Sequence, residues 1–220
     1  ANTQVHYYKV FHHCLNSAVI DEIITSNPMD KIKNEEKPKR RRTERAFLTI
    51  DELKILSQTD FHNATLKKAF LFSCFCGLRH SDIVALTWGN LKKGKVGKME
   101  LYMTQQKTQE ILSLPLSKEA LKQLPVRGKV PDTEKVFKGL ISLGRTNEIL
   151  PKWAAKAGIQ KHITFHSARH THATMMITLG ADLYTVSKLL GHTNIQTTQI
   201  YAKIVDESKE KAIDLIPDIT

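Results

Sequence analysis

The stretch His166–His172, "HSARHTH", places three histidines and one arginine within seven residues. His166 and His170 are four positions apart, so on a helix they share one face, as paired zinc-binding histidines do. The zinc peptidase pattern also requires a glutamate directly after the first histidine, and Ser167 occupies that position. Arg169 lies near the same face and would repel a divalent cation. The pattern therefore argues against a metal site.

Arg169 favours an anion instead. An arginine is always charged and is rarely buried without a partner. His166 and Arg169 are three positions apart on one helical face, which suits binding of a shared anion such as a phosphate. For any one of these histidines alone, a hydrogen-bonded core position is the ordinary explanation.

The composition also points to a polyanionic partner. The chain has 220 residues, with 33 Lys and Arg against 22 Asp and Glu, and a formal net charge of +11. Nucleic acid is the commonest polyanion that such a basic protein binds, although other classes of protein share this charge. Because 41% of the residues are hydrophobic, the chain can bury a real core and is not a disordered basic tail.

Targeting signals and cysteine spacing indicate a cytoplasmic protein. No apolar run reaches the roughly 18 residues that span a bilayer, and we expect no membrane partner and no secretory signal. Cys14, Cys74 and Cys76 do not have zinc-binding spacing, and two of them lie in the apolar run "AFLFSCFCGL". Free thiols in a reducing compartment are the expectation.

The chain divides into an N-terminal helix, a linker and a main domain. Residues 5–25 have helical apolar spacing that ends at Asn27-Pro28. The linker, 31–46, contains "KIKNEEKPKRRRTER" and has no apolar periodicity. The main domain, 47–220, opens with a predicted capping box in which Thr49 is the N-cap and Glu52 follows three residues later.

The main domain is predicted to be mainly α with one small antiparallel sheet, an α+β class. The sheet is expected over roughly 88–116, where apolar and polar residues alternate between glycine-containing turns. Gly77 is expected to end the helix before it. The predicted helices are 49–58, 64–76, 81–87, 117–124, 145–157, 166–179, 182–190, 194–201 and 205–215.

Four segments in order carry a resemblance to a known family. They are "GLRHSDI", "QQKTQ", "HSARHTHAT" and "LLGHTNIQTTQIY", and they contain Arg79, Lys107, His166 with Arg169, and His192 with Tyr201. The chain closely resembles the tyrosine recombinase (phage integrase) family, whose signature runs Arg, Lys, His-x-x-Arg, His or Trp, then Tyr. The resemblance covers about 48–216 and implies the catalytic domain fold of that family. Ala168 and His172 depart from the usual family residues at positions that are not catalytic.

The resemblance implies a phosphoryl transfer on DNA. Tyr201 would attack the scissile phosphate and form a 3′-phosphotyrosyl enzyme with a free 5′-hydroxyl. Tyrosine suits both attack and departure because its oxygen ionises near pKa ~10, far more easily than that of serine. One phosphodiester is exchanged for another, so we expect no ATP, no metal and no other cofactor.

The remaining signature residues would assist this reaction. Arg79 and Arg169 would bind the non-bridging phosphate oxygens as bidentate pairs. His166 would act as an acid–base partner, and His192 would donate a hydrogen bond to the phosphate. Lys107 would protonate the departing 5′-oxygen.

Several of these assignments have alternatives. The four lysines Lys92, Lys93, Lys95 and Lys98 lie in the same sheet region as Lys107, and Lys107 is preferred because the family lysine falls in the second hairpin before a threonine. Tyr201 alone would be an ordinary core tyrosine, and Arg79 could cap a helix C-terminus. Asp82 would orient Arg79 or His166. His170 and His172 are interpreted as packing or supporting residues.

The resemblance also implies roles for the N-terminal residues, the linker and the C-terminal tail. Residues 1–30 would be the C-terminal helix of a truncated core-DNA-binding domain. Four basic linker residues would contact the DNA backbone without reading sequence: Lys39, Arg40, Arg41 and Arg42. The tail after Tyr201 has Ile204, Ala212, Leu215 and Ile216 on one helical stripe and would pack on a neighbour in a homotetramer on two DNA duplexes. The protein without DNA would be a monomer.

The expected function is a DNA integrase that integrates and excises a mobile element at double-stranded recombination sites in the nucleoid, with DNA-bending accessory proteins. The same chemistry would serve a chromosome-dimer resolvase or a DNA invertase. Two readings of another class stay open: a non-catalytic basic DNA-binding protein with structural histidines, and a metal-dependent nuclease.

Overall fold

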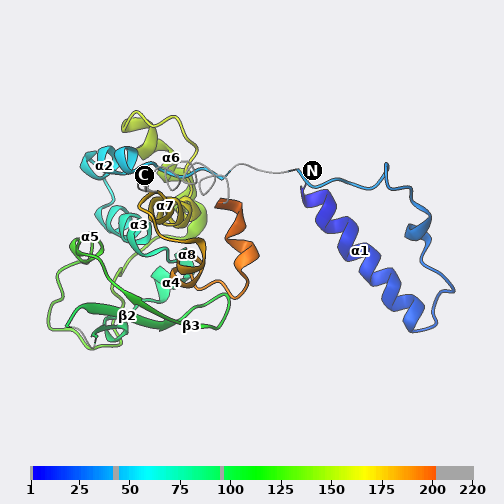
Figure 1. The fold of residues 1–220 in the computed structure, drawn as a ribbon, viewed down its shortest axis with the longest axis horizontal. Coiled ribbons are helices and arrows are strands. Elements are labelled where there is room, and N and C mark those ends of the chain that lie inside the picture. Colours follow the sequence, from blue (N-terminus) through cyan, green and yellow to red (C-terminus); the bar gives the residue numbers. More distant parts are fainter. Residues whose placement is uncertain (1, 42–44, 95–96, 202–220) are drawn as a thin grey trace, which may run out of the picture. The chain divides into compact units, whose positions relative to one another are not determined.

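The computed structural model describes residues 2–41, 45–94 and 97–201 (Figure 1). The chain forms two compact units, 1–44 and 45–220, and the boundary lies inside the predicted linker. None of the helices in the described residues is long and apolar enough to cross a membrane. The predicted helix at 205–215, the tail stripe, Arg42 and Lys95 lie outside the described residues.

The N-terminal unit contains α1 (Asn2–Ile20) and the 3-10 helix η1 (Pro28–Lys31). The sequence predicts a helix over 5–25, and its predicted C-terminal end lies five residues beyond the observed one. Glu22 takes a positive φ of 58°, and the N–H groups of Glu22 and Ile23 bond back to Val19 and Ala18. These bonds form a Schellman motif, which usually has glycine or asparagine at the left-handed position. A glutamate at this position does not indicate a helix end, so the sequence did not predict it.

Three helices open the second unit: α2 (Ile50–Gln58), α3 (Ala64–Cys76) and α4 (His80–Ala85). The predicted capping box is present, because the Thr49 side chain accepts from the Glu52 N–H and the Glu52 carboxylate accepts from the Thr49 N–H. Gly77 ends α3 at a φ of 71°, as predicted. The chain then turns directly into α4, so Arg79 lies at the junction of the two helices.

A three-stranded antiparallel sheet follows, in the order β1 (Leu91–Lys93), β2 (Met99–Thr104) and β3 (Ile111–Pro115). It confirms the sheet predicted at 88–116, although Trp88–Asn90 form the 3-10 helix η2. Leu101 pairs with Leu114 and Met103 with Leu112, and all four side chains are buried. This alternation places one face of the sheet on the core.

The chain ends its described part with α5 (Lys118–Lys122), α6 (Leu143–Lys156), α7 (Phe165–Thr178), α8 (Leu183–Leu189), η3 (Ile195–Thr197) and η4 (Gln199–Tyr201). The predicted helices here are confirmed within about two residues, except 194–201, which is two 3-10 turns. The Asn194 side chain accepts from the Gln196 N–H and starts a tight turn. The threonines that follow are poor helix formers, so the turn is not extended.

The core lies between α3 and α7, which pack against each other (Figure 1). Phe70 contacts the rings of both Trp153 and Phe165 edge-on, and all three are almost fully buried. Each such side chain stabilises the fold by about 1.5–3 kcal/mol. At the end of α3, a Cβ on Gly77 would lie 2.8 Å from the His172 ring of α7. The close contact brings the α3–α4 junction onto the helix that carries "HSARHTH".

Candidate active site

Arg169 joins three segments at the centre of the unit. Its side chain is 3% exposed and donates to the Gly77 carbonyl at 2.8 Å and to the Leu190 carbonyl at 2.7 Å. Burial, and next the charge of Arg79, lower the pKa of Arg169 to about 10, so it stays charged at neutral pH. Neutral carbonyls hold the guanidinium in place without cancelling its charge.

Arg79 lies beside it and carries a free donor. Arg169 donates to the carbonyl of Gly77, two residues before Arg79, so both arginines lie at the junction of α3 and α4. The Arg79 Nη1 atom is buried and has no hydrogen-bond partner among the described residues; the nearest carboxylate oxygen, on Asp82, is 3.8 Å away. A buried unpaired donor beside a second cation is costly unless an anion binds there.

His166 lies three residues before Arg169 on α7, and His192 lies two residues after Leu190, whose carbonyl Arg169 binds. His166 is exposed, yet desolvation within the site, and then the charges of Arg169, Arg45, Arg79 and Lys107, lower its pKa to about 4. His192 Nδ1 forms a hydrogen bond of 2.8 Å with Thr198 Oγ1, and burial followed by Arg169 lowers its pKa to about 4. Both imidazoles are therefore neutral at pH 7 while no anion is bound.

Lys107 lies in the turn between β2 and β3, and its charge is among those that lower the pKa of His166. Gln105, two residues before Lys107, donates to the Leu190 carbonyl that Arg169 also binds, so the sheet turn lies next to the site. Of the alternatives, Lys92 and Lys93 lie on β1, and Lys98 directly precedes β2. Among the described lysines of this region, the charge of Lys107 lowers the pKa of His166, and the catalytic role of Lys107 stays a prediction.

Tyr201 ends the described chain at the same site. Its side chain is 6% exposed, and burial raises its pKa to about 12, against the opposing effects of Arg169 and Arg45. Its hydroxyl lies 2.6 Å from His170 Nδ1. The structure therefore brings together all six signature residues, but it places His170, interpreted from sequence as a packing or supporting residue, on the tyrosine oxygen.

Buried polar side chains position these groups. Asp82 accepts from the backbone N–H groups of Arg79 at 3.2 Å and Gln106 at 2.8 Å, and no contact with His166 is seen among the described residues. Gln105 is fully buried and donates to the Leu190 carbonyl, which Arg169 also uses. Gln105 gave no signal in the sequence, because its partner is 85 residues away.

Arg45 is a further residue that the sequence did not single out. It lies at the end of the basic linker, and its charge lowers the pKa of both His166 and His170. Its place within a run of basic residues was the only available signal. The other linker residues, Lys39, Arg40 and Arg41, belong to the N-terminal unit and are exposed.

The site has cations and a tyrosine hydroxyl, and no cluster of metal ligands occurs in the described ranges. No three His, Cys, Asp or Glu side chains there lie close enough to hold a metal ion. His172 is 3% exposed and packs against Gly77. The arrangement can bind a phosphate between fixed cations and present a phenol to it.

Comparisons with known proteins agree with this chemistry. Residues 46–208 match the Phage integrase family. A tyrosine recombinase of Pseudothermotoga lettingae is 30% identical over 203 residues, which cover 90% of this chain and 69% of the relative. The tyrosine recombinase XerC of Chlamydia pneumoniae is 25% identical over 213 residues, 91% of this chain and 65% of the relative.

Solved structures show the same fold. A lambda integrase dimer bound to a COC′ core site matches with a TM-score of 0.67 at 20% identity, covering 88% of this chain and 70% of that one. The Tn1549 transposon integrase, in complex with circular intermediate DNA, matches with a TM-score of 0.67 at 17% identity, covering 89% of this chain and 73% of that one.

Proposed function

The chain belongs to the phage integrase family and is a site-specific tyrosine recombinase, and on this basis we propose that Tyr201 is its nucleophile and that Arg79 and Arg169 bind the scissile phosphate. One observation carries the proposal. The Gly77 and Leu190 carbonyls hold the buried guanidinium of Arg169. Half-buried Arg79 lies two residues after Gly77, and its buried Nη1 donor has no partner among the described residues. A phosphate would satisfy both.

The reaction balances without an outside reagent. The Tyr201 hydroxyl gives its proton to a neutral imidazole of the site, and its oxygen forms a bond to phosphorus as the bond from phosphorus to the 5′-oxygen breaks. The imidazole returns the proton to the phenol in the reverse step. Lys107 gives a proton to the departing 5′-oxygen, and this proton returns when a 5′-hydroxyl attacks the phosphotyrosine. Charge gathers on the non-bridging oxygens, where fixed arginines stabilise it most effectively.

His166 and His192 contact the same phosphate in this proposal. Their pKa values lie far below the usual range because they are desolvated and cations surround them. A bound phosphate adds negative charge and raises both pKa values, so each imidazole becomes a better hydrogen-bond donor. His166 is exposed, which leaves it open to the substrate.

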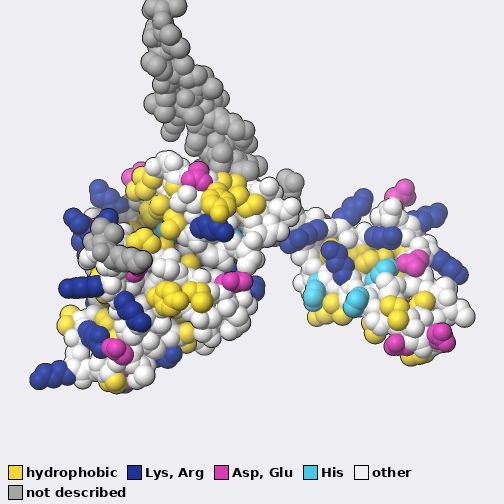
Figure 2. Space-filling model, turned by 60° about the horizontal axis from the view of Figure 1, so that its bottom comes forward, with side chains coloured by type: hydrophobic (Ala, Val, Ile, Leu, Met, Phe, Trp, Pro, Cys, Tyr) yellow, Lys and Arg dark blue, Asp and Glu magenta, His cyan; other side chains and the backbone are white. Residues whose placement is uncertain are grey.

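The substrate is double-stranded DNA. Several solved proteins of this fold are described in complex with DNA. Figure 2 shows Lys and Arg side chains spread over the visible face of both units, with only scattered Asp and Glu. These cations, and the exposed Lys39, Arg40 and Arg41, would contact backbone phosphates without reading bases.

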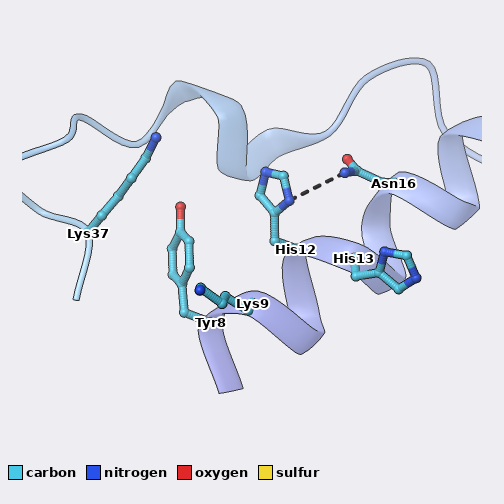
Figure 3. Close-up of a pocket in the computed structure, with 6 residues that line it drawn as sticks. All are labelled: Tyr8, Lys9, His12, His13, Asn16 and Lys37. Atoms are coloured by element: carbon cyan, nitrogen blue, oxygen red, sulfur yellow. Dashed lines mark hydrogen bonds between the residues drawn. The ribbon is translucent and has the colours of Figure 1, made fainter. Parts of the chain in front are cut away.

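The N-terminal unit adds to this DNA-binding charge. Figure 3 shows a pocket along α1 in which Lys9, His12 and His13 come from the helix and Lys37 from the segment opposite. His12 bonds to Asn16 at 3.3 Å and to Asp30 at 2.9 Å. We propose that this unit serves DNA binding and does not belong to the catalytic domain.

The biological role we propose is integration and excision of a mobile element by four protomers on two duplexes, with DNA-bending proteins as accessories. A resolvase or invertase would use the same chemistry. Sequencing the DNA strand attached to the trapped enzyme separates them, because an integrase gives element ends and a resolvase gives one chromosomal site. Removing 205–220 would impair pairing of two sites more than binding of one.

The chemistry is tested with a nicked suicide duplex, from which the cleaved strand diffuses away. Wild-type protein should give a detergent-stable protein–DNA adduct, also with EDTA present, and Tyr201→Phe should bind the DNA and give none. Absence of an adduct in the wild type would indicate a non-catalytic DNA-binding protein. Loss in EDTA that Mg²⁺ restores would indicate a metal-dependent nuclease.

A further inference from the structure

Among the described residues, the side chain of His170 makes a hydrogen bond with the oxygen of Tyr201. His170 Nδ1 and the Tyr201 hydroxyl are 2.6 Å apart, and the two residues are 31 positions apart in the sequence. His170 is 4% exposed and Tyr201 6% exposed. The hydrogen bond is therefore shielded from water, which would otherwise compete for the phenol.

The fold holds both partners of this bond. His170 lies one turn after His166 on α7, and the two rings meet edge to face at 4.7 Å. Tyr201 packs against apolar side chains of α7 and of the α8 region: Ala173, Ile177, Val186 and Leu190. This packing of Tyr201 fixes the position of its hydroxyl relative to His170.

The surroundings of His170 keep its imidazole neutral. Burial is the main cause that lowers its pKa to about 3, and nearby groups add to it: His166 and Arg169 on α7, Arg45 before α2, and His192 after α8. A neutral imidazole has one ring nitrogen with a free lone pair. The phenol of Tyr201 is also neutral, so its O–H donates to Nδ1.

We propose that His170 is the base that accepts the proton of Tyr201 during attack on the scissile phosphate. This inference rests on the proposed role of Tyr201 as the nucleophile. As the phenol oxygen bonds to phosphorus, its proton moves to His170 Nδ1, and the 5′-oxygen leaves with the proton of Lys107. In religation His170 returns the proton to the departing phenol.

This assignment divides the work of the two α7 histidines. His166 is exposed and faces the cations that would hold the phosphate, whereas His170 is buried and faces the nucleophile. A phosphate between Arg79 and Arg169 introduces negative charge near α7. That charge favours an imidazolium at His170, so the base becomes stronger when the substrate is bound.

The test isolates nucleophilic attack from leaving-group protonation. The substrate is the nicked duplex with sulfur as the 5′ bridging atom, because sulfur departs without a general acid. We expect His170→Asn and His170→Ala to slow single-turnover adduct formation by about 10²-fold or more, the range for loss of a general base. The affinity of both variants for DNA should stay within about two-fold of the wild type, because the side chain at position 170 would not contact the phosphate.

Asparagine distinguishes a base from a residue that only positions the tyrosine. Its amide can accept the Tyr201 hydrogen bond but cannot take the proton, so equal loss in both variants supports the base. A near-normal rate in His170→Asn would overturn it. If His170→Ala does not fold, His170→Asn alone decides the matter, and thermal unfolding monitors both.

A fluorinated tyrosine at position 201 provides a second test of the role of His170. Its phenol is more acidic and needs less help from a base, so it should restore most of the rate to His170→Asn. Failure of that rescue would overturn the inference. Mapping the wild-type adduct separates this from failure of the proposed function: an adduct on Tyr201 with unaffected His170 variants overturns only the role of His170, and an adduct elsewhere overturns both.

Discussion

The buried carboxylate of Asp82 accepts a hydrogen bond of 2.8 Å from the backbone N–H of Gln106. Asp82 belongs to the helix that follows Arg79, and Gln106 directly precedes Lys107. One side chain thus connects the segment proposed to bind the phosphate with the turn proposed to protonate the leaving group.

Asp82→Asn should weaken this connection. An amide has one accepting oxygen, so one of the N–H groups of Arg79 and Gln106 would face an NH₂ group. Losing a hydrogen bond to a charged acceptor costs about 1.5–3 kcal/mol, and chemical denaturation should show a loss of that order. Cleavage should slow because the turn that carries Lys107 is displaced. The sulfur-bridged duplex should restore part of the rate, because sulfur departs without a proton from Lys107.

A surface aspartate provides the control for that variant. Asp60 forms an exposed pair with Lys156 at 3.3 Å, and such pairs contribute little to stability. Asp60→Asn should change neither stability nor cleavage measurably. If Asp82→Asn behaved in the same way, Asp82 would have no positioning role.

Gly191 is expected to be essential for the geometry around His192. Its φ is 64°, and a Cβ there would lie 2.8 Å from the Oε1 atom of buried Gln105. Gly191→Ala should therefore lower both the melting temperature and the rate of adduct formation. The matched control is Gly139→Ala. Gly139 has a φ of 78°, and nothing lies within 4 Å of a Cβ added there.

Gly139→Ala isolates backbone strain, which is about 1–2 kcal/mol for a left-handed residue. It should cost stability alone and leave adduct formation unchanged. Equal cleavage rates in the two variants would contradict the coupling between Gln105 and the His192 segment.

Acid should destabilise the fold through its buried histidines. The pKa of His172 is lowered to about 4 and that of His170 to about 3, in both cases first by burial. An unfolded histidine has a pKa near ~6.5, so between these values the unfolded state binds more protons. The stability contribution is fully present above pH ~6.5 and is lost as pH falls towards the folded-state pKa values.

Urea midpoints measured from pH ~7.5 down to ~4.5 test this window. The midpoint should fall below pH ~6.5. His172→Leu, which removes a titrating ring that makes no hydrogen bond in the described residues, should make the fall shallower. A slope unchanged by His172→Leu would show that this ring does not drive the acid response.

Salt should report the role of the linker in DNA binding. Neutralising Lys39, Arg40 and Arg41 should reduce the slope of log K against log salt by roughly 0.9 for each phosphate that the protein no longer neutralises. Lys138→Gln, an exposed lysine paired with Glu134, serves as the control. An unchanged slope in the linker variant would place these residues away from the DNA.

The leaving-group role of Lys107 has its own test. Lys107→Ala should lose about 10²–10⁴-fold in cleavage of ordinary DNA, because an alkoxide leaves poorly without a proton. The sulfur-bridged duplex should rescue it and leave Tyr201→Phe inactive. Rescue of a variant at Lys92, Lys93 or Lys98 in its place would move the role to that lysine.

Local signals in the sequence predicted most elements of the fold. Thr49 with Glu52, and Gly77, mark helix ends by side-chain or backbone chemistry that acts within a few residues. The end of α1 was missed because Glu22 adopts a conformation that glycine usually takes. Residues 194–201 were misread because apolar spacing alone does not separate an α-helix from two tight turns.

The signature residues of the site could be located in sequence by their order, but the support around them could not. The bond between His170 and Tyr201 and the bond between Gln105 and Leu190 span 31 and 85 residues. Each depends on how α7, η4 and the sheet turn pack. Spacing along the chain has no information on such contacts, so His170 could only be interpreted as a packing or supporting residue.

Peptide mapping of the trapped adduct tests the central claim most directly. The wild-type protein is reacted with the nicked suicide duplex, digested with protease and nuclease, and analysed by mass spectrometry. We predict that the residual nucleotide is attached, through a 3′-phosphate, to the peptide that contains Tyr201. Attachment to another residue such as Tyr184, or an adduct that persists in Tyr201→Phe, would contradict the account.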